Sequence, residues 1–373
     1  MRRKTLCLLL ALAALLPCRA QGTRDRFSWE YGADFRFHFD NREFAYSQDA
    51  ITPSMTVAAV VLTPSVGFSV RQSRAVEHRL TAGVELAHDL GSQTHRDLFR
   101  EVLLYYDAHV RARRGSFEGV AGIFPRRFLE GEYSEAFFSD SLLFADRNLE
   151  GLLLKWSSPR FNAELGCDWM GQAGYARKER FQVISSGAWQ VHPLIYLGWT
   201  GSFYHYAGSE LAPGVVDNHL LEPWVKVGFL RPSTRQEITL KAGLLAGYQC
   251  DRVRSSEPVF PIGGEVTLKG RYKSLSLQNA VYFGNNLQPF YGRFDLGGNK
   301  YGHDLYFGAP FYTGFYDRVE FAWMPALTRY LDLRLAVRAH FSGAGFLGWQ
   351  QCFGLVVNLD AVRWREFYPG RCL

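Results

Sequence analysis

The sequence predicts an all-β protein, a transmembrane antiparallel up-and-down β-barrel of about sixteen strands, within a range of about 14–18. Three observations predict this fold. Apolar and polar residues alternate with a period of two in many short segments, the connections between these segments alternate in length, and aromatic residues make up 15% of the chain. A period of two indicates an extended strand whose two faces meet different surroundings.

The segment from Phe27 to Phe39 shows the alternation most clearly. Its odd-numbered positions hold Phe, Trp, Tyr or Ala, and its even-numbered positions hold Ser, Glu, Gly, Asp, Arg and His. Aromatic rings at both ends, with a small residue in the middle, are typical of a strand whose outer face crosses a lipid bilayer. A single strand of this kind also fits a soluble sheet, so the prediction depends on how often the pattern returns.

The pattern returns along the whole chain. The other predicted strands are approximately 56–70, 80–90, 102–110, 117–123, 149–156, 161–170, 181–191, 194–206, 220–230, 237–250, 265–272, 274–284, 315–324, 330–341 and 346–359. Pro64 and Pro223 fall inside two of these segments. Proline has no backbone N–H for the ladder, so these two segments fit a strand least well.

The connections between the predicted strands form two classes that alternate. The short ones are 71–77, 113–116, 157–160, 192–193, 231–235, 273 and 325–329, and the long ones are 40–54, 91–97, 124–148, 171–180, 207–219, 251–264 and 285–314. This alternation indicates a barrel with short turns at a periplasmic rim and longer loops at an extracellular rim. A closed barrel also leaves no unpaired strand edge.

The N-terminus has the anatomy of a secretory signal. MRRK precedes an apolar run from Thr5 to Pro17, and small residues stand before a cleavage site after Ala20. We therefore expect a signal peptide over residues 1–20 and one barrel domain over 21–373, with 360–373 as a periplasmic tail. No run of ~18 apolar residues follows the signal, so we expect no transmembrane helix.

Charge and cysteine content exclude several classes of partner. The net charge of +6 is scattered, without the basic stripe of a nucleic-acid-binding protein. Cys167, Cys250, Cys352 and Cys372 are far apart and lack histidines at metal-binding spacing. We expect no nucleic acid, no metal and no cofactor.

One stretch and the last strand carry a family resemblance. Residues 119–156, GVAGIFPRRFLEGEYSEAFFSDSLLFADRNLEGLLLKW, are similar in layout to phosphate-selective-porin-like and alginate-export-like barrels, and CFGLVVNL, residues 352–359, resembles the assembly signal of such barrels. The chain thus resembles a Gram-negative outer-membrane porin of a Bacteroidetes-like, aromatic-rich style. The resemblance implies that the third long loop, Phe124–Asn148, folds into the lumen and sets the pore width.

That loop holds the candidate constriction. In this interpretation, charged residues of the loop face charged residues of later strands across the pore. The candidate constriction residues of the loop are Arg126, Arg127, Glu130, Glu132 and Glu135, and those of the later strands are Arg318, Arg334 and Arg338. Opposed charges at a constriction select which solutes pass. The alternative is an exposed loop whose charges face water.

The inward-facing positions of the predicted strands add a second signal. They are mainly acidic in the first half of the chain and mainly basic in the second half, where Lys226, Lys241 and Lys269 lie. Because consecutive strands are neighbours around such a barrel, the two signs would face each other across the lumen. The alternative is a salt-bridged plug.

The longest predicted loop, 285–314, is rich in aromatic rings and is a candidate extracellular ligand loop through Tyr291, Phe294, Tyr301 and Tyr306. Aromatic faces with polar neighbours can stack on a sugar. The alternative is that the rings pack the loop over the barrel mouth.

Enzymatic motifs are missing from the sequence. No Gly-x-Ser-x-Gly, HExxH or phosphate-binding pattern appears, so we expect no catalytic residues and no enzyme. An outer-membrane lipid hydrolase would need a His–Ser or His–Asp/Glu set at the lipid rim, and the nearest candidates are His205, His219, Ser209 and Glu210 around one extracellular loop.

The predicted function is that of an outer-membrane porin for passive diffusion of small hydrophilic solutes. The alternatives are a non-conducting structural or assembly barrel and an outer-membrane hydrolase that modifies lipid or lipopolysaccharide. The expected partners are outer-membrane lipid and lipopolysaccharide, a small solute and further copies in a homotrimer. The expected location is the outer membrane of a Gram-negative cell.

Overall fold

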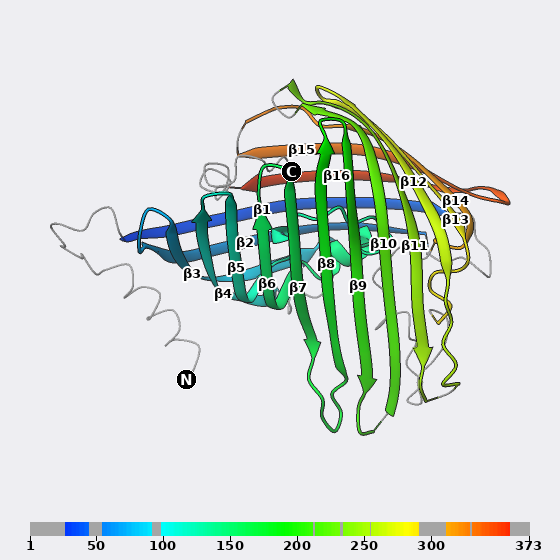
Figure 1. The fold of residues 1–373 in the computed structure, drawn as a ribbon, viewed down its shortest axis with the longest axis horizontal. Coiled ribbons are helices and arrows are strands. Elements are labelled where there is room, and N and C mark those ends of the chain that lie inside the picture. Colours follow the sequence, from blue (N-terminus) through cyan, green and yellow to red (C-terminus); the bar gives the residue numbers. More distant parts are fainter. Residues whose placement is uncertain are drawn as a thin grey trace.

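The computed structural model describes residues 27–44, 54–91, 98–211, 213–231, 234–253, 255–290, 311–328 and 330–358. Sixteen antiparallel strands close into one barrel, in which each strand pairs with its sequence neighbours and β1 pairs with β16 (Figure 1). The predicted fold class is confirmed. The expected signal peptide, 1–20, and tail, 360–373, lie outside the described residues.

Each predicted strand is present, with ends that differ by up to seven residues. The strands are β1 (Phe27–Phe44), β2 (Met55–Arg71), β3 (Val76–Asp89), β4 (Phe99–Ala112), β5 (Gly115–Pro125), β6 (Asn148–Ser157), β7 (Phe161–Gly171), β8 (Glu179–His192), β9 (Ile195–Gly208), β10 (Pro213–Arg231), β11 (Gln236–Asp251), β12 (Ile262–Tyr272), β13 (Leu275–Gly284), β14 (Gly314–Trp323), β15 (Leu331–Ser342) and β16 (Gly345–Asn358).

The two faces of the strands differ as the alternation predicts. On β1, Trp29 and Tyr31 point outward and are 51% and 89% exposed, whereas Asp34 and Asp40 point into the barrel and are buried. In Figure 1, β1 and β2 cross β8–β10 at a steep angle, as expected when tilted strands lie on opposite walls. The outer face is therefore an apolar band, and the inner face is polar.

Both prolines lie inside strands. Pro64 pairs with Ala33 of β1, and the pairing of β2 with β3 is interrupted between Leu62 and Ser65. Pro223 likewise pairs with β9, at an interruption of the pairing between β10 and β11. The missing N–H of each proline thus coincides with a local gap in the ladder.

Two connections at the long-loop rim are shorter than the alternation of short and long connections predicts. β9 ends at Gly208 and β10 begins at Pro213, because the hairpin continues past the predicted strand ends through a register shift. Strands β15 and β16 are joined by residues 343–344 alone. The long-loop rim is therefore not uniform around the barrel.

The segment 126–147, which we call the inner segment, connects β5 to β6 and contains two short helices, η1 (Arg126–Phe128) and α2 (Asp140–Ala145). The Ser139 hydroxyl caps α2 by accepting a hydrogen bond from the Leu142 N–H. Among the described residues, no helix is long and apolar enough to cross a membrane.

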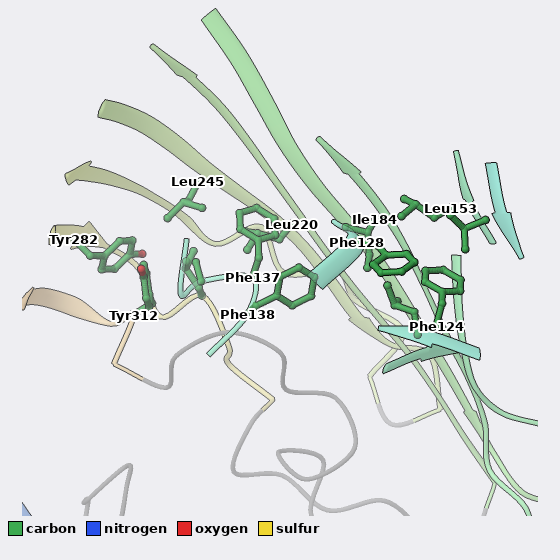
Figure 2. Close-up of a cluster of buried hydrophobic side chains, with 14 of the residues drawn as sticks. Phe124, Phe128, Phe137, Phe138, Leu153, Ile184, Leu220, Leu245, Tyr282 and Tyr312 are labelled. Atoms are coloured by element: carbon green, nitrogen blue, oxygen red, sulfur yellow. The ribbon is translucent and has the colours of Figure 1, made fainter. Parts of the chain in front are cut away.

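The apolar core lies inside the barrel. Phe128, Phe137 and Phe138 of the inner segment are almost fully buried and belong to one cluster with inward-facing wall residues such as Leu153 and Ile184 (Figure 2). The same cluster continues to Leu220, Leu245, Tyr282 and Tyr312. Packing of these rings holds the inner segment against the wall.

Gly122 on β5, between the core residues Val120 and Phe124, provides a test of the barrel wall. Its φ is +123°, and a Cβ there would lie 2.1 Å from the Leu104 carbonyl oxygen. We expect Gly122→Ala to lower the free energy of unfolding by about 1–3 kcal/mol, because backbone strain and a clash act together. The measurement is the temperature at which the folded, heat-modifiable band is lost in electrophoresis.

Gly119→Ala on the same strand is the matched control. A Cβ at Gly119 would meet its nearest neighbours at 3.6 Å, an ordinary contact. Equal transition temperatures for the two variants would contradict the assignment of strain to Gly122.

Candidate functional site

The inner segment lies across the lumen and contacts opposite walls. Arg127 forms an ion pair with Asp34 on β1, and Arg318 on β14 forms one with Glu135. Between them, the Thr200 hydroxyl on β9 donates to the Glu132 carbonyl oxygen at 2.9 Å. These contacts come from inward-facing residues around much of the barrel, so the segment is inside it.

A single wall carboxylate holds the middle of the segment. Glu164 on β7 accepts the backbone N–H groups of Glu130 and Gly131 at 2.8 Å each and the Tyr133 hydroxyl at 2.7 Å. Three donors on one buried carboxylate fix the path of the chain at this point. The sequence pattern marks Glu164 as inward-facing but gives no sign of this role.

Arg126, Arg127 and Glu130 do not face the basic strands that we expected to oppose them. The Arg126 guanidinium is buried and lies 2.8 Å from both Asp146 and Asp168, and Glu130 lies 2.8 Å from Lys155. Tight turns after β5 direct these side chains back toward the β1 and β5–β7 wall. Their contacts are those of anchors for the inner segment.

Glu132, Glu135 and Asp140 reach the other wall. Glu132 pairs with Lys226, Glu135 with Arg318, and Asp140 with Arg338. Burial alone would raise the pKa values of Glu132 and Asp140, but the adjacent Lys226 and Arg338 outweigh it and hold both below their usual range. Both carboxylates are therefore ionised at neutral pH.

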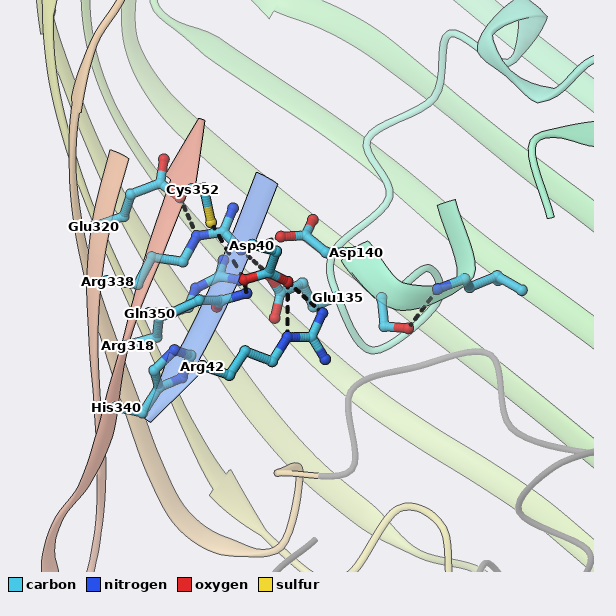
Figure 3. A network of polar contacts seen from close by, with 12 residues as sticks. Asp40, Arg42, Glu135, Asp140, Arg318, Glu320, Arg338, His340, Gln350 and Cys352 are labelled. Carbon is cyan, nitrogen blue, oxygen red and sulfur yellow. Dashed lines mark hydrogen bonds and ion pairs between the residues drawn. The ribbon is translucent and has the colours of Figure 1, made fainter. Parts of the chain in front are cut away.

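Arg338 is the centre of a larger polar network (Figure 3). It also pairs with Glu320, which in turn lies 2.6 Å from Arg334. Nearby, Asp40 accepts from Arg42 and from Gln350 at 2.8 Å. Of the predicted constriction, the structure thus brings together one acid, Glu135, and the three arginines.

A cavity of about 780 Å³ lies between the inner segment and the wall of β10–β15. It extends from Arg231 and Arg235, near the short-turn rim, to Asp140 and Arg338. Among the described residues that line it, nine are basic and seven acidic. A second cavity of about 330 Å³ lies on the opposite side of the segment, against β1–β5.

The lumen does not have one acidic and one basic wall. The inward carboxylates of the first half pair with cations of the same half, as in Glu85–Arg147 at 2.7 Å and Glu118–Lys155 at 2.9 Å. The lysines of the second half likewise have nearby acids, as in Lys241–Glu222 at 2.9 Å. Because these charges are paired locally, the transverse field that the sequence suggested is largely cancelled.

The candidate ligand loop residues Tyr291, Phe294, Tyr301 and Tyr306 lie outside the described residues. The described ends of this connection turn inward. Tyr312 is buried and donates a hydrogen bond to Glu265 on β12, and Leu287 is buried beside it in the same core. For the described residues of this connection, these contacts support the alternative that its side chains pack against the barrel.

A second polar group lies on the outer face of the barrel. His205 on β9 and Asp217 on β10 are directly opposite each other in the antiparallel register, with 3.0 Å between Nδ1 and Oδ1. The expected partners Ser209 and Glu210 lie beyond the end of β9, and Glu210 donates its N–H to Gly174 in the β7–β8 connection. The sequence did not indicate Asp217 as the partner of His205, because the register of the β9–β10 hairpin decides which acidic residue faces His205.

The chain was compared with known proteins. A family model described as Lipid A 3'-O-deacylase-type matches residues 30–213. No curated protein matches the sequence. Similar solved structures include a loop-deletion mutant of OmpT, an outer membrane protein of Vibrio cholerae, which is 10% identical with a TM-score of 0.52 and covers 90% of this chain and 100% of its own.

Two other similar structures have TM-scores of 0.49. The outer membrane channel DcaP of Acinetobacter baumannii is 8% identical and covers 91% of this chain and 99% of its own, and OprB of Pseudomonas putida is 9% identical and covers 89% and 94%. Identities this low concern the fold alone. The chain forms a closed sixteen-stranded antiparallel barrel, a fold similar to that of the Vibrio cholerae outer membrane protein.

The expectation that the chain is not an enzyme is contradicted by the family match, because that family is named for a hydrolytic activity. Short local sequence patterns do not indicate such an activity in this chain. Residues that face each other across a β-hairpin are separated in sequence by a distance that no fixed motif records.

Arg126 provides a test of the anchoring contacts. We expect Arg126→Met to lower the free energy of unfolding by about 3–5 kcal/mol, because Asp168 would remain buried without its cation. Arg100→Met is the matched control. Arg100 pairs with Asp89 at 3.4 Å with both side chains about half exposed, and its loss should cost about 1 kcal/mol or less. Urea unfolding of both variants measures the difference, and equal losses would contradict the anchoring role.

Proposed function

We propose that the protein is an outer-membrane channel for small hydrophilic solutes, which pass along the cavity beside the inner segment. The observation that carries this proposal is the polar cavity of about 780 Å³ between the segment and the wall of β10–β15. Charged side chains line it, so water and polar solutes are favoured over apolar ones.

The arrangement of ion pairs supports a narrowing of this cavity by the inner segment. Glu135 and Asp140 are held toward the wall by Arg318 and Arg338, and Glu132 is held by Lys226. Side chains fixed in this way keep a passage at a constant width. We propose these six residues and Arg334 as the constriction.

The charges also support a weak preference for anions. Arg271 lines the cavity and has no ion pair among the described residues, whereas Arg334 is paired with Glu320 and remains partly exposed. With nine basic and seven acidic lining residues, the cavity carries a small positive excess. The effect is modest because most charges are paired.

Planar-bilayer recording of the refolded protein tests the channel. We expect discrete conductance steps, and under a salt gradient we expect Arg271→Gln combined with Arg334→Gln to move the reversal potential toward that of cations. The reason is that both side chains add positive charge to the cavity.

Arg100→Gln serves as the matched control, because Arg100 lies near the long-loop rim and does not line the cavity. A folded, heat-modifiable barrel that never conducts would contradict the channel, and an unchanged reversal potential in the double variant would contradict the proposed selectivity.

The family match favours a second candidate function. We infer from it that the protein hydrolyses an acyl ester of lipid A or of another lipid in the outer leaflet. Nothing prevents one barrel from having both activities, because solutes use the lumen and lipids touch the outer wall. Both proposals place the protein in the outer membrane, surrounded by lipopolysaccharide, and a homotrimer remains a prediction for native mass measurement.

Incubation of the folded protein with vesicles that contain lipopolysaccharide tests the second function. We expect release of free fatty acid and a lipid A product that is lighter by one acyl chain in mass spectrometry. The protein denatured by heat is the control. Equal release from folded and denatured samples would contradict the hydrolase.

A further inference from the structure

The outer wall near the long-loop rim carries a polar group that the channel does not use. His205, Asp217 and Arg252 come from β9, from β10 and from the residue that follows β11. His205 has the parity of outward-facing Phe203 on β9, Asp217 that of Leu221 on β10, and Arg252 that of Leu244 on β11; these three apolar side chains are 49%, 45% and 49% exposed. The three polar residues therefore belong to the face that contacts lipid, and ionisable side chains on such a face are costly unless they have a function.

The geometry of His205 and Asp217 is that of an oriented base. A carboxylate can only accept a hydrogen bond, so His205 Nδ1 carries the proton that it donates to Asp217 Oδ1 at 3.0 Å. This leaves the Nε2 lone pair available, and Nε2 has no hydrogen-bond partner among the described residues. Asp217 is buried beneath this contact and fixes both the tautomer and the orientation of the ring.

Arg252 completes the group from the turn that follows β11. Its Nε donates to Asp217 Oδ2 at 2.6 Å, so the two oxygens of one carboxylate hold His205 and Arg252 side by side. The guanidinium itself is more than half exposed. The hydrogen bond and charge of Asp217 raise the pKa of Arg252 above its ordinary value, so it remains a cation that faces the lipid headgroups.

Aromatic rings place this group at the boundary of the apolar band. His219 lies between Phe203 and Tyr248, with ring centroids 5.2 and 5.5 Å apart, and Phe181 packs on His205 at 5.2 Å. Rings of this kind mark the membrane interface in barrels. The ester groups of membrane lipids lie at that same depth, between the acyl chains and the headgroups.

An apolar groove lies farther along the same wall, toward the bilayer centre. A hollow of about 820 Å³ on the wall of β9–β13 is lined by outward-facing Leu197, Val225 and Leu244, and it owes its depth to glycines such as Gly264. Pro223, at its edge, is six residues along β10 from Asp217, or about 20 Å at ~3.3 Å per residue. An acyl chain whose ester lies at His205 can follow the wall toward this groove.

We propose that His205, Asp217 and Arg252 form a catalytic site on the lipid-facing wall that hydrolyses an ester-linked acyl chain of an outer-leaflet lipid. This inference rests on the second function proposed above and assigns its residues. It separates that activity from the lumen, so lipid never enters the channel.

The reaction needs only water and the lipid. His205 Nε2 takes a proton from a water molecule as the water oxygen bonds to the ester carbonyl carbon. Arg252 faces the negative charge that forms on the carbonyl oxygen, and Asp217 stabilises the imidazolium. The bond from the carbonyl carbon to the alcohol oxygen then breaks, that oxygen takes the proton from Nε2, and a fatty acid and a free hydroxyl remain.

The test uses vesicles of lipopolysaccharide and the folded full-length protein, with released fatty acid as the readout. We expect His205→Asn to lower the initial rate by at least about 10²-fold, because no base remains at this position. Asp217→Asn should cause a loss of similar size, because an amide no longer enforces the reactive tautomer. Arg252→Gln should cause a smaller loss, of about tenfold.

His192→Asn is the matched control, since His192 lies at the other end of the β8–β9 hairpin and receives a hydrogen bond from the Leu194 N–H. It should keep the wild-type rate, and all variants should keep the heat-modifiable band of the folded barrel. Hydrolysis that persists in folded His205→Asn would overturn the site and leave the second function intact. No hydrolysis by the wild-type protein would overturn both.

Discussion

Closure of the sheet is the constraint on which the rest of the structure depends. Lipid offers no hydrogen-bond partner, so each strand of a membrane barrel must satisfy its backbone through its two neighbours. The pairing of β1 with β16 supplies the last ladder and removes both sheet edges. Closure has a consequence for the interior, because sixteen strands enclose more space than wall side chains alone can fill. The inner segment and the ends of the longest loop occupy part of that space.

The interior combines two kinds of cohesion. Phenylalanines of the inner segment pack on wall residues, while nearby carboxylates and cations form local pairs such as Arg126–Asp168 and Glu118–Lys155. Each buried charge needs its partner, because desolvation is costly without one. This pairing explains why the lumen is polar without having a strong field. It leaves a larger polar cavity between the segment and β10–β15 and a smaller cavity between the segment and β1–β5.

The two faces of the wall therefore have different capabilities. The inner face presents paired charges beside a polar cavity, which supports the proposed passage of polar solutes. The outer face presents apolar side chains, and the ion-paired group around Asp217 stands at its edge, among aromatic rings. In a β-strand, neighbouring side chains point in opposite directions, so the residues that face the lumen and those that face lipid are different. The proposed channel and the match to a hydrolase family are thus compatible within one barrel.

The sequence by itself determined the strands, their faces and their number, because a period of two is a local property that survives in any context. It also determined that Glu132, Glu135 and Arg338 point inward or lie in the third loop. It could not determine their partners, because ion pairs depend on register and on the path of the inner segment. Arg126 and Glu130, for example, contact Asp168 and Lys155 rather than the basic strands. Only the tertiary structure brought Asp217 to His205 and Arg252, since these contacts cross three strands, and hairpin registers set by closure decide which side chains meet.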